Sequence, residues 1–351
     1  MYINFLNIFS AKITGKNGAT RNFLLEEYSD YISEKPKNDV TIFIDFIKDE
    51  ISKNQYIVKK PVSYDSKGVF IFDDNNKKLR IDFNNLASNC CKISSDLNFH
   101  PPFFSIFFEY ISYIEALKKN KILCHSASFI YNDKVIVCPA WRNVGKTNLM
   151  LNFMKKGAYY ISDDWCMIDA KKNIHRIPKR IHLFDYNLTN NPDILSDVKP
   201  SLYNLSTLNQ SLVDGKYNIS ENIKKDIQNK LNIRLHPKTL FPSKVIDFSV
   251  GINDIFFLKR KNLKNVSIKK MDIDSLINNL IKVIQFEQYP FRLAYDIHKS
   301  RTGITNSFLE KEIDTYRKIS KNAFSESNIY MINTPDQSFS NEVMIQILNN
   351  I

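Results

Sequence analysis

The segment from residue 140 to residue 147 constrains this chain more than any other stretch. It reads Ala140-Trp141-Arg142-Asn143-Val144-Gly145-Lys146-Thr147. Apart from alanine at the first position, it fits the Walker A pattern G-x-x-x-x-G-K-[ST], a loop whose backbone N–H groups surround nucleotide phosphates. The lysine of such a loop reaches the β- and γ-phosphate oxygens, and the hydroxyl after it binds Mg²⁺. Because the chain has only 8 Gly in 351 residues, a glycine directly before Lys-Thr is an informative match.

The residues on either side of this loop supply the strand and the helix that the motif requires. The run Lys134–Cys138 is rich in β-branched residues and predicts a strand, whereas Asn148–Met154 has helical character. The alternative without phosphate binding is a strand–turn–helix in which Lys146 is only a solvated lysine of the first helical turn. The flanking pattern therefore favours an α/β protein with a phosphate-binding loop.

Polar residues on two neighbouring predicted strands extend the pattern. Ile122–Ile130 is strand-like and contains His125, and Tyr159–Ser162 is strand-like and ends in the pair Asp163-Asp164. In open α/β sheets, groups at the carboxyl ends of strands face the crevice that binds ligands. We therefore expect the two aspartates to lie beside the phosphates, although an Asp pair after a strand is also common in turns.

Four features in this order resemble the HPr kinase/phosphorylase family and its smaller HPr-kinase-like relatives. They are His125, the 140–147 loop, Gly157 and the triplet Ser162-Asp163-Asp164. Members of the family carry a histidine, a P-loop and an Ala/Ser-Asp-Asp triplet, and they look akin to phosphoenolpyruvate carboxykinase. The spacings match what is expected of the group (140 − 125 = 15 and 163 − 147 = 16 residues). The resemblance is close over residues 122–181 and holds only in outline elsewhere.

The resemblance implies an ATP- and Mg²⁺-dependent kinase that phosphorylates a hydroxyl, most plausibly of a serine or threonine in a protein or precursor peptide. Residues 140–147 would bind the nucleotide, and Lys146 would neutralise charge on its β- and γ-phosphates. Thr147 and Asp164 would bind the metal, with Asp164 alternatively supporting the residues that do. Asp163 would be the general base. His125 would lie against Asp163 or the transferred phosphate.

The loop departs from the family pattern, and the departures leave alternatives open. Ala140 replaces the glycine of the first tight turn, and the middle of the loop lacks its usual small residues. Asn143 tolerates a left-handed backbone and would substitute for an inner glycine, while Arg142 would add a phosphate contact. A degenerate, catalytically idle nucleotide-binding or scaffold protein is one alternative, and a small-molecule alcohol kinase is another. The glutamate-containing signature of phosphorylase activity is missing, so phosphorolysis is not predicted.

The composition predicts a globular, cytoplasmic protein. The chain is 43% hydrophobic and 25% charged, and no apolar run approaches the length of a membrane-spanning helix. Its five cysteines are odd in number and have no C-x-x-C spacing, which predicts a reducing compartment without disulfides or a zinc site. The apolar N-terminus lacks the basic segment typical of a signal peptide. We therefore expect it to form a first strand and not a signal peptide.

The charge balance predicts an anionic partner. The 49 Lys and Arg residues exceed the 37 Asp and Glu residues and give a net charge of +12. The lysines are spread along the chain, without a basic block interleaved with aromatics, so we expect no nucleic-acid and no membrane partner. We expect the positive charge to attract phosphates and acidic peptides instead. A homo-oligomer is left open.

We expect residues 1–100 to form a smaller β-rich region and residues 101–351 to form the HPr-kinase-like domain with a mixed central sheet. The first region contains strand-like runs, with a hairpin loop over 73–76. Helices are expected over 103–119, 220–231, 275–286 and 307–319, and core strands over 245–248 and 254–260. The polar segment 187–242 is expected to be a lid or an acceptor-binding insertion, from its position and composition.

Overall fold

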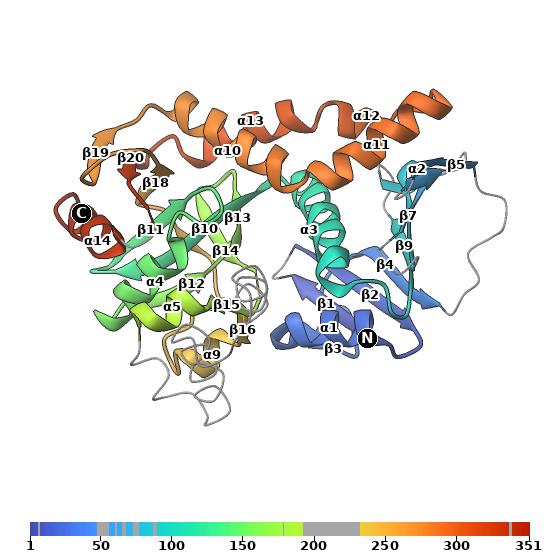
Figure 1. Ribbon diagram of the computed structural model, residues 1–351, viewed down its shortest axis with the longest axis horizontal. Coiled ribbons are helices and arrows are strands. Elements are labelled where there is room, and N and C mark those ends of the chain that lie inside the picture. The colour runs from blue at the N-terminus through green and yellow to red at the C-terminus, as the bar shows by residue number, and fades with distance from the viewer. Residues whose placement is uncertain are drawn as a thin grey trace, which may run out of the picture. The chain divides into compact units, whose positions relative to one another are not determined.

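The chain forms two compact units in the computed structural model (Figure 1). The structure describes residues 1–5, 8–47, 56–59, 62–64, 68–72, 77–86, 90–177, 179–191, 232–336 and 339–351. Unit 1 comprises Met1–Cys124, Met167–Pro178 and Ile273–Ser325, and unit 2 comprises His125–Cys166, Lys179–Asp272 and Glu326–Ile351. The α/β class and the mixed sheets that the sequence predicts are confirmed. The division at residue 100 stays a prediction.

Unit 1 contains a mixed sheet of strands that all precede residue 97. The strands are β1 (Tyr2–Phe5), β2 (Phe9–Gly15), β3 (Ile32–Ser33), β4 (Val40–Ile47), β5 (Tyr56–Lys59), β6 (Val62–Tyr64), β7 (Gly68–Phe72), β8 (Lys78–Asp82) and β9 (Cys91–Asp96). Their order is β3-β1-β2-β4-β9-β8-β7-β6-β5, with β2, β4 and β9 parallel. The expected first strand is therefore a pair of strands, β1 and β2, in antiparallel register. The predicted hairpin loop 73–76 lies outside the described residues.

The remaining elements of unit 1 are helices and one further strand. They are α1 (Ala19–Glu27), the 3-10 helix η1 (Ser29–Tyr31), α2 (Phe83–Leu86), α3 (Pro101–Lys118), β14 (Asn173–Arg176), α10 (Ile273–Glu287), α11 (Tyr289–Thr302), α12 (Ser307–Glu310) and α13 (Glu312–Ala323). Helix α3 begins at a proline, whose fixed φ suits the first turn, and the His100 ring accepts a bond from Phe103 N. It contacts α1, α11 and α13 and buries a row of aromatic rings.

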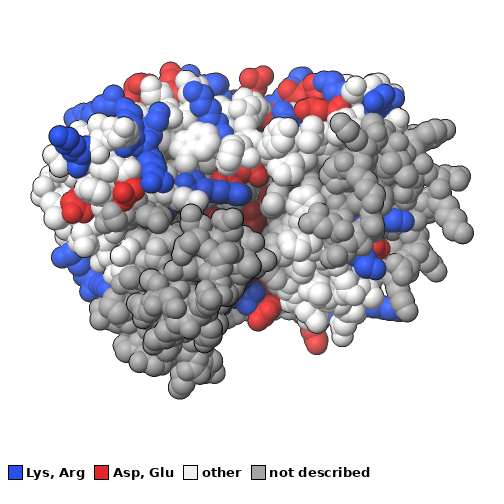
Figure 2. Space-filling model, viewed as in Figure 1, with Lys and Arg blue, Asp and Glu red and all other residues white. Residues whose placement is uncertain are grey.

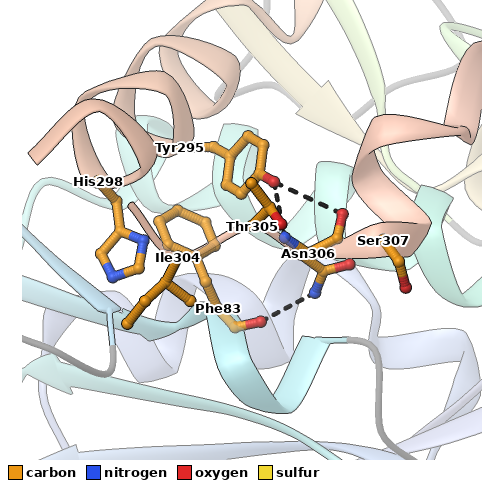
Figure 3. A pocket seen from close by; sticks show the side chains of 7 residues that line it. All are labelled: Phe83, Tyr295, His298, Ile304, Thr305, Asn306 and Ser307. Atoms are coloured by element: carbon orange, nitrogen blue, oxygen red, sulfur yellow. Dashed lines mark hydrogen bonds between the residues drawn. The ribbon is translucent and has the colours of Figure 1, made fainter. Parts of the chain in front are cut away.

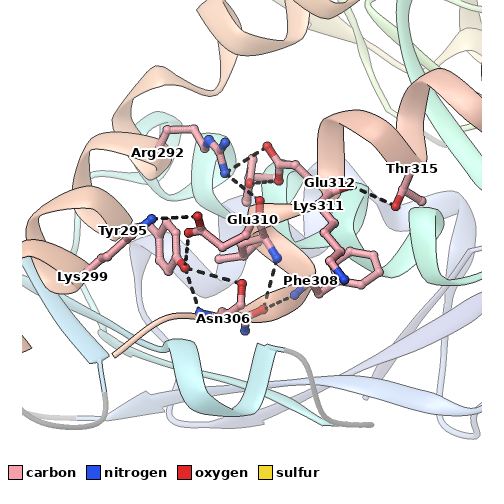
Figure 4. A network of polar contacts seen from close by, with 11 residues as sticks. Arg292, Tyr295, Lys299, Asn306, Phe308, Glu310, Lys311, Glu312 and Thr315 are labelled. Carbon is pink, nitrogen blue, oxygen red and sulfur yellow. Dashed lines mark hydrogen bonds and ion pairs between the residues drawn. The ribbon is translucent and has the colours of Figure 1, made fainter. Parts of the chain in front are cut away.

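A buried ion pair connects three helices of unit 1 (Figure 4). Arg292 on α11 bonds Glu312 at the start of α13 at 3.1 Å, and Tyr110 on α3 donates its hydroxyl to the same carboxylate. Burial raises the pKa of Glu312, and the adjacent Arg292 charge opposes that rise. Nearby, Tyr295 and Lys299 both bond Glu310, at 2.8 and 2.7 Å. These contacts fix the helices to one another and satisfy the charged groups there within the fold.

Unit 2 is organised around a second mixed sheet. Its elements are β10 (Lys121–Tyr131, in this unit from His125), β11 (Lys134–Pro139), α4 (Lys146–Lys155), β12 (Tyr159–Ser162), β13 (Trp165–Asp169, in this unit to Cys166), β15 (Ile181–Phe184), α5 (Asp185–Asn190), β16 (Asn232–Leu235), α9 (Pro237–Leu240), β17 (Val250–Gly251), β18 (Asp254–Arg260), β19 (Ser267–Lys270), β20 (Asn328–Thr334) and α14 (Ser340–Leu348). The strand order runs β13-β10-β11-β18-β20-β19, and β12 also pairs with β10. Strands β11, β18 and β20 are parallel, so their carboxyl ends share one edge.

Two expected elements differ in the structure. Val245–Phe248 is not a core strand, because only Val245 forms an isolated bridge, to Tyr160, while Phe248 is 61% exposed. The helix expected over 307–319 is broken at Lys311, where α12 ends and α13 begins. The expected helix 220–231 and most of the expected insertion 187–242 lie outside the described residues. Within the described ranges, none of the helices combines the length and apolar character needed to cross a bilayer.

Candidate active site

The predicted phosphate-binding loop connects β11 to α4 in unit 2. Asn143 has φ 57 and Gly145 has φ 101, so both occupy the left-handed region. The prediction that Asn143 replaces an inner glycine is confirmed in its conformation. Gly145 is the residue before α4. Residues with a side chain rarely adopt a backbone φ of this value, whereas glycine adopts it readily. The turn thus depends on two residues of suitable backbone freedom.

Ala140 shows why the first glycine of the pattern is dispensable here. Its φ is not positive, its side chain is fully buried, and it pairs with Leu258 in a parallel bridge. Its N–H also donates to the carbonyl of His125 at 3.1 Å. Ala140 therefore extends the strand instead of turning, and an alanine serves there as well as a glycine.

Lys146 lies under the loop at the start of α4. It is only 8% exposed, and its Nζ donates to the carbonyls of Ala140, at 3.4 Å, and Trp141, at 3.1 Å. The positive end of the α4 dipole is at the same place, so the loop concentrates positive potential. The side chain of Trp141 packs against the hydrophobic core of unit 2, as expected of a packing residue.

Thr147 and Asp163 meet at the centre of the site. Thr147 Oγ1 donates to Asp163 Oδ2 at 2.9 Å. Thr147 lies on α4, and Asp163 directly follows β12. Asp163 is 5% exposed, and its Oδ1 has no hydrogen-bond partner among the described residues. Burial, followed by the charge of Asp164, raises the pKa of Asp163 to about 6, against the lowering effect of Thr147 and Lys146. A buried carboxylate with one open oxygen is suited to accept a proton or a cation.

Asp164 has a different set of neighbours. Its Oδ1 bonds His125 Nε2 at 3.0 Å, and its Oδ2 accepts from Lys179 Nζ at 2.6 Å. Its φ of 73 is held by a bond from Ser126 N to its carbonyl, at 3.1 Å. Burial favours a raised pKa, but Lys179 and then His125 lower the pKa of Asp164 well below its ordinary value. Asp164 therefore remains an anion between two nitrogen donors.

His125 bonds Asp164, a partner that the expected contact with Asp163 or the transferred phosphate did not include. The ring is buried beside Trp165, with centroids 4.9 Å apart. Burial and, after it, the Lys146 charge lower the pKa of His125 to about 4. The imidazole is thus neutral at neutral pH, and its Nε2 carries the proton that Asp164 accepts, because an anionic carboxylate can only accept.

Sequence reasoning missed Lys179 and three asparagines. Lys179 is 7% exposed and precedes β15, but lysines are so frequent along the chain that no signal distinguished it. Asn148, in the first turn of α4, accepts from Asn187 Nδ2 at 2.7 Å and Asn191 Nδ2 at 3.5 Å. All three asparagines are almost completely buried. They attach α5 to the helix that follows the 140–147 loop.

The described residues contain no group of three or more His, Cys, Asp or Glu side chains arranged to hold a metal ion. The oxygen ligands that the expected site offers are the Thr147 hydroxyl, which bonds Asp163, and the carboxylates of Asp163 and Asp164. Mg²⁺ in nucleotide sites usually takes one or two protein oxygens and keeps phosphate and water ligands. The donor set fits such an ion better than one that needs a complete protein cage.

Unit 1 contains a pocket of about 180 Å³ between α2, α11 and the residues before α12 (Figure 3). Asn306 donates to the carbonyl of Phe83 at 3.0 Å, and the Tyr295 hydroxyl accepts from Asn306 N at 2.8 Å. These polar groups bond one another inside the fold. The pocket therefore offers packing surfaces more than reactive groups, and the loop of unit 2 is the better candidate site.

Comparison with known proteins does not assign this chain to a family. No protein-family model matches the chain, and no curated protein matches it. Among solved structures, the chain is similar to the Hpr(Ser) kinase/phosphatase from Coxiella burnetii, with 10% identity and a TM-score of 0.30. The match covers 65% of this chain and 95% of that one. The likeness is a distant structural one, and the chemistry of the site rests on the contacts described above.

Proposed function

We propose that the chain is an ATP-dependent kinase that transfers the γ-phosphate to a hydroxyl group, with a serine or threonine of a protein or peptide as acceptor. The hydrogen bond between Thr147 and Asp163 carries this proposal. It brings the end of a phosphate-binding loop to a buried carboxylate, and phosphoryl transfer needs both at one place.

The loop itself supports phosphate binding. The N–H groups of Asn143 and Gly145 have no acceptor within the described part of the chain. Lys146 Nζ donates to the neutral carbonyls of Ala140 and Trp141, and charged phosphate oxygens are stronger acceptors than these. A phosphate therefore fits the donors that this loop presents, and the α4 dipole favours it further.

Mg²⁺, when bound, would neutralise the charge that develops on the transferred phosphate. Thr147 would supply one oxygen ligand. Asp164 would supply another beside its bonds to His125 and Lys179, because each carboxylate oxygen keeps a second lone pair. Asp163 keeps one oxygen open and has the raised pKa that a base needs.

In the proposed reaction, Asp163 takes the proton of the acceptor hydroxyl. The new bond forms between that oxygen and the γ-phosphorus, the bond from phosphorus to the bridging oxygen breaks, and ADP leaves with the electron pair. Lys146 would hold the phosphates in place. Lys179 and Asp164 keep the neutral His125 ring fixed beside the reacting groups.

The test is transfer of labelled γ-phosphate to a mixture of Ser- and Thr-containing peptides, with wild-type protein and Asp163→Asn. We expect the variant to lose a factor of about 10² to 10⁴ in transfer, as general bases contribute, while it still binds nucleotide. Asp169→Asn is the matched control, because Asp169 is similarly buried but caps a turn and bonds His175.

Undiminished transfer by Asp163→Asn would exclude Asp163 as the base. A small alcohol serves as a second acceptor in the same assay. Nucleotide binding without transfer to any peptide or to this alcohol would favour the idle binding protein that the altered loop suggests. Transfer to the alcohol alone would identify a small-molecule kinase.

A further inference from the structure

A strongly basic segment follows β18 and continues through β19. The residues from 259 to 270 include Lys259, Arg260, Lys261, Lys264, Lys269 and Lys270, and the segment contains no Asp or Glu. All of these cations except the half-buried Lys259 are exposed. In Figure 2, Lys and Arg side chains gather at the end of unit 2 that carries β19, at the upper left. We call residues 259–270 the basic segment.

The basic segment starts beside the phosphate-binding loop. Leu258 bridges Ala140 in parallel, so Lys259 and Arg260 come directly after the residue that pairs with the first position of the loop. Arg260 pairs with Thr334, at the carboxyl end of β20. Ligands of open α/β sheets bind at this edge. Lys259 and Arg260 are therefore at the edge where an acceptor would have to approach, and β19 carries Lys269 and Lys270 back along β20, away from this edge.

Strand β19 adds a second feature, an exposed sheet edge. It is the last strand in the order of its sheet and pairs with β20 on one side within the described residues. Val266 and Ile268 pack against the core of unit 2 and fix the strand, whereas Lys269 and Lys270 face solvent. An exposed edge can add an extended peptide through main-chain hydrogen bonds.

We propose that the basic segment is the docking surface for an acidic, extended part of the peptide acceptor. Lysine on an edge strand repels a second copy of the same strand, since like charges opposite each other are destabilising, and it attracts an acidic one. The segment has no aromatic residue on which bases could stack, which disfavours single-stranded nucleic acid. Leu263 is its one large exposed apolar side chain, too little for a membrane surface.

This inference rests on the proposed kinase function for the role of the peptide, but its test needs no nucleotide. The probe is a fluorescent, unstructured peptide of Glu and Ser, compared with the same peptide carrying Gln for Glu and with a single-stranded oligodeoxynucleotide of equal charge. Binding is followed by anisotropy at increasing salt, because contacts between exposed charges weaken with screening.

We expect the wild-type protein to bind the acidic peptide and to show no detectable binding of the Gln peptide. A variant with Lys261→Ser, Lys264→Ser, Lys269→Ser and Lys270→Ser should bind at least about tenfold more weakly, as four exposed charge contacts imply. A control with Lys16→Ser, Lys35→Ser, Lys37→Ser and Lys318→Ser removes the same charge from exposed positions of unit 1 and should bind like the wild type.

Three results would overturn the inference. They are no binding of the acidic peptide, equal loss in both variants, and tighter binding of the oligonucleotide that is lost in the first variant. If the acidic peptide binds as expected but the protein fails to bind ATP, the docking surface stands and the kinase proposal fails.

Discussion

At the scale of single residues, the two adjacent aspartates have opposite environments. Asp163 faces a hydroxyl and keeps one oxygen open, while Asp164 lies between a lysine and a histidine. The pKa of Asp163 is raised by burial and by the neighbouring anion, whereas the pKa of Asp164 is lowered by Lys179 and His125 despite burial. Pairs of titratable groups with diverging pKa values are typical of acid–base sites.

Residue-scale prediction from the sequence succeeded where backbone conformation decided the outcome. Asparagine tolerates a left-handed φ, so the role of Asn143 follows from its residue type. Lys179 could not be found in this way, because its position depends on the pairing of β15 and on a contact with a residue 15 positions earlier. The same holds for the pairing of His125 with Asp164, which depends on how β10 and the turn after β12 meet.

The buried His125 predicts a pH-dependent stability for unit 2. The pKa of His125 is about 4 in the folded chain, against an ordinary value of 6.5, so the unfolded chain takes up a proton first as the pH falls. Stability is then lost as the pH falls from about 6.5 to about 4, by an upper limit of about 3 kcal/mol. Asp163 acts in the opposite sense, because its folded pKa of about 6 is above its ordinary value.

His125→Gln isolates the histidine contribution. We expect the variant to lose less stability than the wild type between about pH 7 and about pH 4, in urea unfolding followed by tryptophan fluorescence. Both tryptophans, Trp141 and Trp165, belong to unit 2, so the signal reports on that unit. Parallel pH curves for the two proteins would contradict a neutral, buried His125.

At the scale of elements, the site depends on how α4 begins. The helix starts directly after a left-handed glycine, and the asparagines 148, 187 and 191 attach it to α5. The sequence predicted β10, β11, β12, β18 and the body of α4, because local patterns of β-branched and apolar residues specify them. It failed for Val245–Phe248, where only Val245 forms a bridge to a strand and Phe248 is exposed.

Gly145→Ala tests the loop as an element. An L side chain at φ 101 costs about 1–3 kcal/mol and distorts the turn, so we expect lower stability and loss of nucleotide binding. Gly157→Ala is a matched control, because its φ of 93 is similar and the added Cβ would meet no atom within 4 Å beyond the adjoining residues of the chain. It should lose comparable stability but bind nucleotide normally, as measured by thermal unfolding and calorimetry.

Two results for this pair of variants would contradict the prediction. If Gly145→Ala binds nucleotide as well as Gly157→Ala does, the left-handed turn is not needed for phosphate binding. Equal loss of binding in both variants would mean that general destabilisation, and not the loop, controls affinity.

At the scale of the whole molecule, each unit is assembled from three separate segments of the chain. Such an arrangement rests on pairings between residues far apart in sequence, for example β18 with β20, and no local pattern predicts them. The whole proposed phosphate site nevertheless falls within unit 2, from His125 to Lys179. We therefore expect the chemistry to be a property of that unit, with the start of its basic segment at the same sheet edge.

The central claim is that the 140–147 loop binds a nucleotide with Mg²⁺, and calorimetry of ATP binding tests it most directly. We expect Mg²⁺-dependent binding by the wild type, strong weakening in Lys146→Ala, and no change in Lys156→Ala, an exposed lysine at the other end of α4. Failure of the wild-type protein to bind ATP, GTP or pyrophosphate, or equal binding by Lys146→Ala, would contradict this claim.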